Sequence, residues 1–256
     1  MILWGIFIPA VTLLFTFYFQ YIDGLFSGKV KVYKIDQVSQ PNPLPREIRN
    51  AVIALILFCL AGMLTGYSID RGWTRVYTEF TYTVSGVGYL FLSFFAAVLI
   101  HDIYFYLTHR LLHVDFVFRH VHATHHRSLN TNAWSAFSFH PLEGLVQIGI
   151  VPLVAFFLPI QETVFLAFTA FLLFMSVYGH AGYELRVNKQ RALDIFNTSL
   201  HHYQHHKYVK YNFGIYFNLW DRLLRTNYPQ YSESLASLRT RIKKDMVETT
   251  ARKDAE

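Results

Sequence analysis

Cysteine and charge are both scarce in this chain of 256 residues. The single cysteine, Cys59, excludes an internal disulfide framework and leaves no cysteine set for an iron–sulfur cluster or a typical structural zinc site. Charged residues make up only 16% of the chain, while 53% of its residues are hydrophobic. Average soluble domains are about 25% charged, so this composition argues against an ordinary soluble protein.

Several sequence motifs are missing as well. The chain has no nicotinamide, flavin or haem fingerprint, no HExxH zinc-hydrolase motif and no internal repeat. It also has no aromatic-flanked basic motif of a nucleic-acid-binding kind, so the net charge of +6 requires no nucleic-acid partner. A basic face against anionic lipid headgroups is the ordinary cause of such a charge. Any redox chemistry must take its electrons from another protein.

Four long apolar stretches account for the composition. Three are single stretches, at residues 1–20, 51–67 and 84–100, and the fourth, at 145–178, has one polar break at 159–163. About 20 helical residues cross a bilayer, so the first three predict one span each and the fourth predicts a helical hairpin. The first stretch lacks the basic region and the cleavage site of a signal peptide, and we expect a retained span. The predicted fold is all-α, a multi-pass integral membrane helical bundle.

The basic residues between the spans predict an orientation. Five lie between the first two stretches and two between the next two: Lys29, Lys31, Lys34, Arg46 and Arg49, then Arg71 and Arg75. The remaining 16 of the 23 basic residues follow the third stretch. The positive-inside rule then places the first loop, and everything after the third span except the hairpin, on the cytoplasmic side.

Histidine is the residue that stands out. The chain has 13 histidines, none of them in the first 100 or the last 50 residues. Most fall in "HRLLH" (109–113), "HVHATHH" (120–126) and "HHYQHH" (201–206). Histidine is a poor helix former, so packing gives no reason to cluster it. On a helix, positions i, i+3 and i+4 share a face, and each set can therefore present two or three imidazoles to one point.

Such a set of imidazoles predicts metal binding. Imidazole suits iron, zinc, copper and nickel, and one metal takes only four to six ligands, so this many histidines suit two metals better than one. A closed zinc site would normally recruit cysteine. Nitrogen-rich ligation with open positions beside a membrane is typical of iron that activates O₂, although spacing alone leaves the metal open. We therefore expect a cytoplasmic histidine-rich helical cap that holds a di-metal site.

The three histidine boxes resemble those of the fatty acid hydroxylase and sterol desaturase superfamily of integral-membrane di-iron enzymes. The segments "FHPLEG" (139–144), "GHAGYE" (179–184) and "NFGIYFNLWDRLLRTNYPQY" (212–231) are also similar, and the resemblance covers about residues 95–231. Within the superfamily, "SAFSFHPLEGLVQ" (135–147) is most similar to the sterol C-5 desaturases. Arg225 departs from the pattern, because the family usually has glycine there.

The resemblance implies a set of site residues. The implied metal ligands are His109, His113, His122, His125, His126, His180, His201, His202, His205 and His206. His140 and Asp221 are the implied catalytic residues: His140 either begins a helix or lines the site, and Asp221 orients an imidazole or makes a simple salt bridge. We expect His101, with Asp102, to support the ligands, and His120 to lie on the surface.

The resemblance also implies a function, an O₂-dependent di-iron oxidoreductase that desaturates or hydroxylates a lipid, with a sterol favoured. The implied cofactors are two iron ions, which zinc can replace, and O₂ is the co-substrate. The implied electron donor is a cytochrome b5-like protein or a ferredoxin with its reductase. The alternatives are a hydroxylase of a fatty acyl, ceramide or carotenoid lipid and, outside enzymes, a metal-binding membrane transporter.

We expect three regions along the chain. Transmembrane helices and loops occupy residues 1–100, and a polar cytoplasmic tail occupies 232–256. The catalytic region lies between them, at 101–231, and includes the membrane hairpin at about 145–178.

Overall fold

The structure is a computed structural model, and it describes all residues except 1, 22–32, 36–41, 185–194, 239 and 241–256. Two of the basic residues used to predict the orientation, Lys29 and Lys31, lie outside the described residues, as does most of the polar tail.

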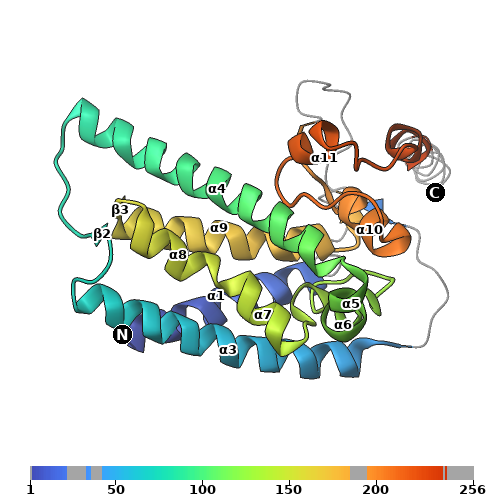
Figure 1. Cartoon of the computed structure of the whole chain (residues 1–256), viewed down its shortest axis with the longest axis horizontal. Coiled ribbons are helices and arrows are strands. Elements are labelled where there is room, and N and C mark those ends of the chain that lie inside the picture. Colours follow the sequence, from blue (N-terminus) through green and yellow to red (C-terminus); the bar gives the residue numbers. More distant parts are fainter. Residues whose placement is uncertain (1, 22–32, 36–41, 185–194, 239, 241–256) are drawn as a thin grey trace, which may run out of the picture.

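Four long helices form the body of the molecule. They are α1 (Ile2–Gln20), α3 (Leu44–Asp70), α4 (Val84–Leu112) and α9 (Glu162–His180). Each is long and apolar enough to cross a membrane. They run along the long axis of the molecule (Figure 1). The predicted helical bundle of membrane spans is therefore confirmed.

The fourth apolar stretch is less regular than the hairpin predicted from the sequence. Its first arm consists of two short helices, α7 (Pro141–Ile148) and α8 (Ile150–Phe157), which meet at Gly149. The strand β3 (Ile160–Gln161) then pairs with β2 (Val76–Tyr77), and this ties the turn to the loop between α3 and α4. The Gln161 side chain accepts hydrogen bonds from the backbone N–H groups of Thr163 and Val164, which caps the start of α9.

Glycines let α1 and α3 pack closely. A Cβ atom added to Gly62 would lie 2.7 Å from the carbonyl oxygen of Trp4, and one added to Gly66 would lie 2.7 Å from Cδ1 of the same tryptophan. Small residues at such positions are typical of helix pairs in membranes. The outer faces of the long helices are apolar and exposed, as at Leu60 and Phe91. This pattern is the inverse of a soluble surface and fits contact with lipid.

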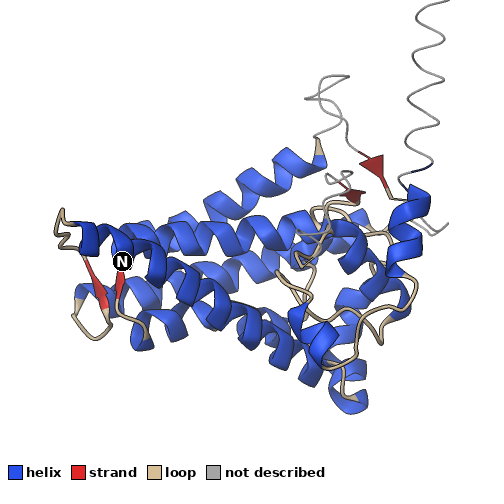
Figure 2. Ribbon diagram, turned by 90° about the horizontal axis from the view of Figure 1, so that it is seen from above, coloured by secondary structure: helices blue, strands red, loops and turns tan. Residues whose placement is uncertain are grey.

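A cap of short elements covers one end of the bundle, as Figures 1 and 2 show, and α4 extends into it as far as Leu112. The other elements of the cap are α5 (Asp115–Val117), η1 (Phe118–His122), α6 (Ala123–His126), η2 (Ser135–Phe137), α10 (Ser199–Tyr208), α11 (Leu219–Leu223) and the antiparallel pair β1 (Tyr33–Lys34) and β4 (Tyr183–Glu184). The continuation of the third span beyond residue 100 was predicted, and it brings the first histidine box into the cap.

Buried polar contacts fasten the cap to the bundle. The fully buried carboxylate of Glu47, at the start of α3, accepts a hydrogen bond of 2.7 Å from the side-chain amide of Asn132. One turn later, Asn50 donates to the hydroxyl of Ser138. The segment between α6 and α7 is thereby held against the first turns of α3.

Candidate metal centre

The structure gathers nine of the predicted ligands into two groups. Within each group the candidate ligand atoms lie within 4.8 Å of one another. The first group is His109, His113, His122, His126 and His205, and the second group is His125, His180, His202 and His206. Two compact sets of nitrogen ligands are the arrangement that a di-metal site requires.

Two of the histidine boxes are divided between the groups. The i, i+4 pair of the second box, His122 and His126, enters the first group, whereas His125 enters the second. The third box does the reverse: His202 and His206 enter the second group and His205 the first. The expectation that each box serves one point is therefore wrong for these two boxes. The helical segment of each box lies between the two groups. The residue three positions after the first ligand, His125 or His205, therefore faces the opposite group from the i, i+4 pair.

A π-helical turn precedes the second box. Residues Phe118–His122 form this turn, which leads directly into α6. Such turns are rare and are often found at functional sites. Here the turn brings His122 to the group while its ring contacts Glu143 on α7.

Backbone carbonyls fix the protonation of several rings. The Nδ1–H of His109 donates to the carbonyl of Phe213 at 2.9 Å, and that of His205 donates to the carbonyl of Tyr211 at 2.6 Å. The Nδ1–H of His180 donates to the carbonyl of Ser176 at 2.8 Å. Since a neutral imidazole has one N–H, these bonds leave each Nε2 unprotonated, with its lone pair available to a metal.

The Nε2 atoms converge at distances that fit a shared cation. Nε2 of His180 lies 2.9 Å from that of His202 and 3.3 Å from that of His206. In the first group, Nε2 of His205 lies 3.1 Å from that of His126. Nitrogens bound about 2.1 Å from one metal, at right angles to each other, lie about 3.0 Å apart. Without a cation these lone pairs would repel each other, so the residues fit a metal ion in each group.

Buried carboxylates orient the ligands from outside the groups. Oε1 of Glu143 lies 2.8 Å from Nδ1 of His122, and both side chains are almost fully buried. The carboxylate of Asp221 accepts from the backbone N–H groups of Phe213 and Gly214 and from the hydroxyl of Thr226. Asp221 thus holds in place the segment that contains Phe213, whose carbonyl accepts the hydrogen bond from Nδ1–H of His109.

Asp102 fastens the same segment to α4. Its carboxylate accepts from the backbone N–H groups of Tyr216 and Phe217 and from the indole N–H of Trp220. Arg225 follows at φ 55°, a left-handed conformation that favours glycine, and this explains why glycine is usual there in the superfamily.

Burial keeps the cap histidines neutral. It lowers the pKa of His126 to about 3, and it lowers the pKa values of His205 and His206 well below the ordinary value; the neighbouring imidazoles add to the shift. Neutral imidazole is the form that binds metals, so the site is suited to binding at neutral pH.

Some predicted site residues lie outside both groups. His201 is buried, and neither of its ring nitrogens has a hydrogen-bond partner among the described residues; its Nε2 lies 3.8 Å from the carboxylate of Asp221. His140 caps α7 by accepting from the N–H of Leu142, which is the helix-starting alternative. His101 contacts the hydroxyl of Tyr216 at 2.6 Å, and His120 is exposed and donates to the carbonyl of Phe116.

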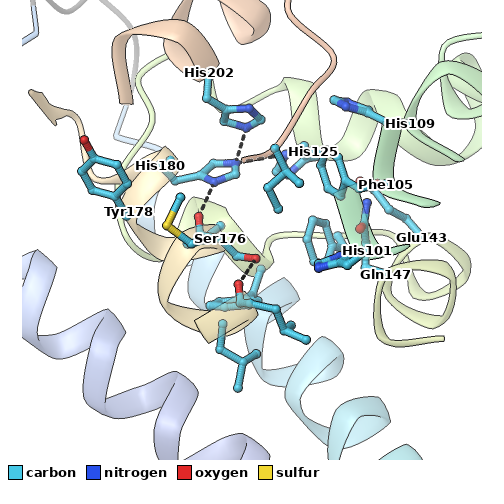
Figure 3. A pocket seen from close by; sticks show the side chains of 18 of the residues that line it. His101, Phe105, His109, His125, Glu143, Gln147, Ser176, Tyr178, His180 and His202 are labelled. Carbon is cyan, nitrogen blue, oxygen red and sulfur yellow. Dashed lines mark hydrogen bonds between the residues drawn. The ribbon is translucent and has the colours of Figure 1, made fainter. Parts of the chain in front are cut away.

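An apolar pocket opens beside the two groups. About 790 Å³ of space lies within its wall, and this figure includes open solvent. Both groups contribute to its wall: His109 and His122 from the first, and His125, His180 and His202 from the second. Figure 3 shows His180 and His202 pointing toward each other at one side of the pocket. Most of the remaining wall is aromatic or aliphatic, for example Phe58, Phe105, Phe137, Leu172 and Met175.

Sequence reasoning missed two kinds of site residue. The carbonyls of Tyr211 and Phe213 act through the backbone, which leaves no mark in the side-chain pattern. The pocket residues Leu172, Met175 and Gln147 lie within apolar stretches that hydropathy assigns simply to the membrane. The periodicity of those stretches could not separate the pocket face from the lipid face.

The chain resembles known lipid-modifying proteins. It is 30% identical over 182 residues to a Delta(7)-sterol 5(6)-desaturase of Saccharomyces cerevisiae, covering 71% of this chain and 48% of that protein. It is 28% identical over 182 residues to the lathosterol oxidase of Homo sapiens, covering 71% of this chain and 60% of that protein. The chain thus spans only about half of the length of these relatives.

A further relative is named as a monooxygenase. The sphinganine C4-monooxygenase 2 of Arabidopsis thaliana is 30% identical over 198 residues, which cover 76% of this chain and 72% of that protein. No solved structure gives a significant match to the chain. The family model described as fatty acid hydroxylase matches residues 94–226, which include every histidine of the two groups. The chain therefore belongs to the fatty acid hydroxylase family, as its histidine boxes predicted.

Proposed function

We propose that the protein is an O₂-dependent di-iron oxidoreductase that desaturates or hydroxylates a lipid, with a sterol as the favoured substrate. One observation carries the proposal: two groups of neutral imidazoles form part of the wall of an apolar pocket at the end of a membrane bundle. The sterol assignment is supported by the similarity to a Delta(7)-sterol 5(6)-desaturase and to lathosterol oxidase. The catalytic region is proposed to be residues 101–231.

The two histidine groups would each hold one iron ion. Bound iron, with O₂, would supply the oxidation of an unactivated C–H bond; zinc has no redox chemistry and would be an inactive replacement. The chain's own residues hold the rings in the Nδ1–H form through the carbonyls of Tyr211, Phe213 and Ser176. The apolar wall would bind the lipid and exclude water from the reacting carbon.

The proposal includes an external electron donor and a cytoplasmic location for the cap. The sequence contains no nicotinamide, flavin, haem or ferredoxin motif of its own, so a cytochrome b5-like protein or a ferredoxin with its reductase would reduce the metals. The basic residues support a cytoplasmic location for the cap. A reporter fused after residue 256 should read cytoplasmic and one inserted near Gly72 external, and the opposite pair of results would overturn this orientation.

A second candidate is hydroxylation of a sphingoid or fatty acyl lipid. It is favoured by the similarity to sphinganine C4-monooxygenase 2, of which the chain covers 72%. A metal transporter is disfavoured, because its ligands would lie near the middle of the spans, whereas these groups lie in the cap and at the adjoining ends of α4 and α9.

The decisive experiment is expression in a host supplied with sterols and with sphinganine, followed by lipid mass spectrometry. The expected product has lost two hydrogens or gained one oxygen, requires O₂ and is absent with the His125→Ala variant. Unchanged lipids from protein that is folded, loaded with iron and supplied with a reductant would contradict the proposal.

A further inference from the structure

Besides its histidines, the pocket wall includes six residues with polar side chains: Glu143, Gln147, Ser176, Tyr178, Asn197 and Thr198. The hydroxyl of Ser176 donates to the carbonyl of Leu172, and the hydroxyl of Thr198 accepts from the N–H of His201. Oε1 of Glu143 bonds to Nδ1 of His122, and Oε2 is buried away from the pocket space with no partner among the described residues. The side-chain amide of Asn197 has no partner among the described residues, but its polar atoms are buried away from the pocket space. Apart from Gln147, none of these groups is both accessible to a ligand and without a partner among the described residues.

Gln147 is different. It lines the pocket from α7 and is only partly buried, and its carboxamide makes no hydrogen bond within the part of the chain that the structure describes. Figure 3 shows it near His101 and Glu143. An unpaired, accessible amide in an apolar wall is the kind of group that fixes the orientation of a bound ligand.

The position of Gln147 relates it to the metal groups. It follows Glu143 by four residues on α7, so the two side chains lie on one face, with Cβ atoms about 5–6 Å apart. Glu143 itself contacts His122 of the first group. In a bound lipid, a polar atom that contacts Gln147 would therefore be separated by only a few bonds from the carbon that lies at the histidine groups.

We propose that the Gln147 carboxamide binds a hydroxyl group of the lipid substrate and so determines which carbon faces the two histidine groups. A carboxamide both donates and accepts hydrogen bonds, and so does a hydroxyl group. A sterol carries a hydroxyl group on its ring system, and a sphingoid lipid carries hydroxyl groups near one end of its chain. The inference rests on the proposed function for its substrate class. It makes Gln147 a binding and specificity residue.

The test compares the binding of paired probes to the purified, metal-loaded full chain in detergent micelles. The first pair is cholestanol and cholestane, and the second is sphinganine and its 3-deoxy form. The variant is Gln147→Met, which keeps the length of the side chain and removes its hydrogen bonds, and Gln147→Leu repeats the test with another shape. Met175→Leu, in the same pocket, is the matched control because it changes no hydrogen-bonding group.

If Gln147 makes one hydrogen bond to the C3 hydroxyl, the wild type should prefer the member of one pair that carries this hydroxyl by about tenfold. Gln147→Met should reduce that preference to near one, and Met175→Leu should keep it. A preference for cholestanol that depends on Gln147 supports the inference with a sterol substrate. If only the sphinganine pair shows a preference that depends on Gln147, the inference is supported and the sterol assignment is excluded. If neither pair shows a preference that depends on Gln147, the inference is overturned, whatever turnover is observed.

Discussion

Replacing Glu143 should weaken one metal site and leave the other intact. Its carboxylate lies 2.8 Å from Nδ1 of His122, and no histidine of the second group contacts it through a hydrogen bond. Glu143→Ala would leave the buried N–H of His122 unpaired, at a cost of about 1–3 kcal/mol. Loss of such an outer partner typically lowers metal affinity by about 10–100-fold. Glu143→Gln should have a smaller effect, because its amide oxygen can still accept this hydrogen bond.

The assay is metal retention by the purified protein, measured by mass spectrometry across a chelator series. At a chelator concentration where the wild type keeps two metals per chain, Glu143→Ala should keep about one. Glu47→Ala is the control, since Glu47 is fully buried but bonds to Asn132 rather than to a histidine. That variant should lose stability and keep both metals. Loss of both metals or of neither from folded Glu143→Ala would refute the reasoning.

Three further predictions concern the ligands, the metal-free protein and the bundle. His202→Ala should abolish activity and lower metal content, whereas the exposed His120→Ala should retain both; equal damage from the two would contradict the assignment. Burial lowers the pKa of His126 from 6.5 to about 3, so the unfolded metal-free chain binds more protons in this range. The Tm of the metal-free protein should therefore fall as the pH is lowered from about 7.5 to about 5.5, and a rise in Tm would count against this reasoning. Gly62→Leu should lower the free energy of unfolding by about 1–3 kcal/mol through its clash with Trp4. Gly88→Leu, where an added Cβ meets no atom of the described residues within 4 Å, should be nearly neutral in a thermal melt.

Hydropathy and spacing predicted the parts of the molecule that depend on local pattern. The spans follow from apolar length, and the continuation of α4 to Leu112 follows from the absence of any helix-breaking residue after His101. The side of the membrane follows only from charge, and it stays a prediction. The first arm of the hairpin was less predictable, because Gly149 divides it into α7 and α8 where the composition remains uniformly apolar.

The division of the histidine boxes depends on tertiary placement. Spacing identifies His202, His205 and His206 as neighbours on a helix, but only the position of α10 between two groups sends His205 to one and its neighbours to the other. His201 belongs to the same box by sequence and lies instead beside Asp221. The sequence pattern therefore predicted the kind of site and most of its residues, while the partition among metals required the structure.

The metal content of the active protein tests the central claim most directly. Elemental analysis of protein purified under conditions that preserve activity, with the amount of chain measured by amino-acid analysis, should give about two metal ions per chain, with iron in the active form. Zinc in place of iron would preserve this count and remove activity. One metal ion or none per chain in fully active protein would contradict a di-metal centre built from the two histidine groups.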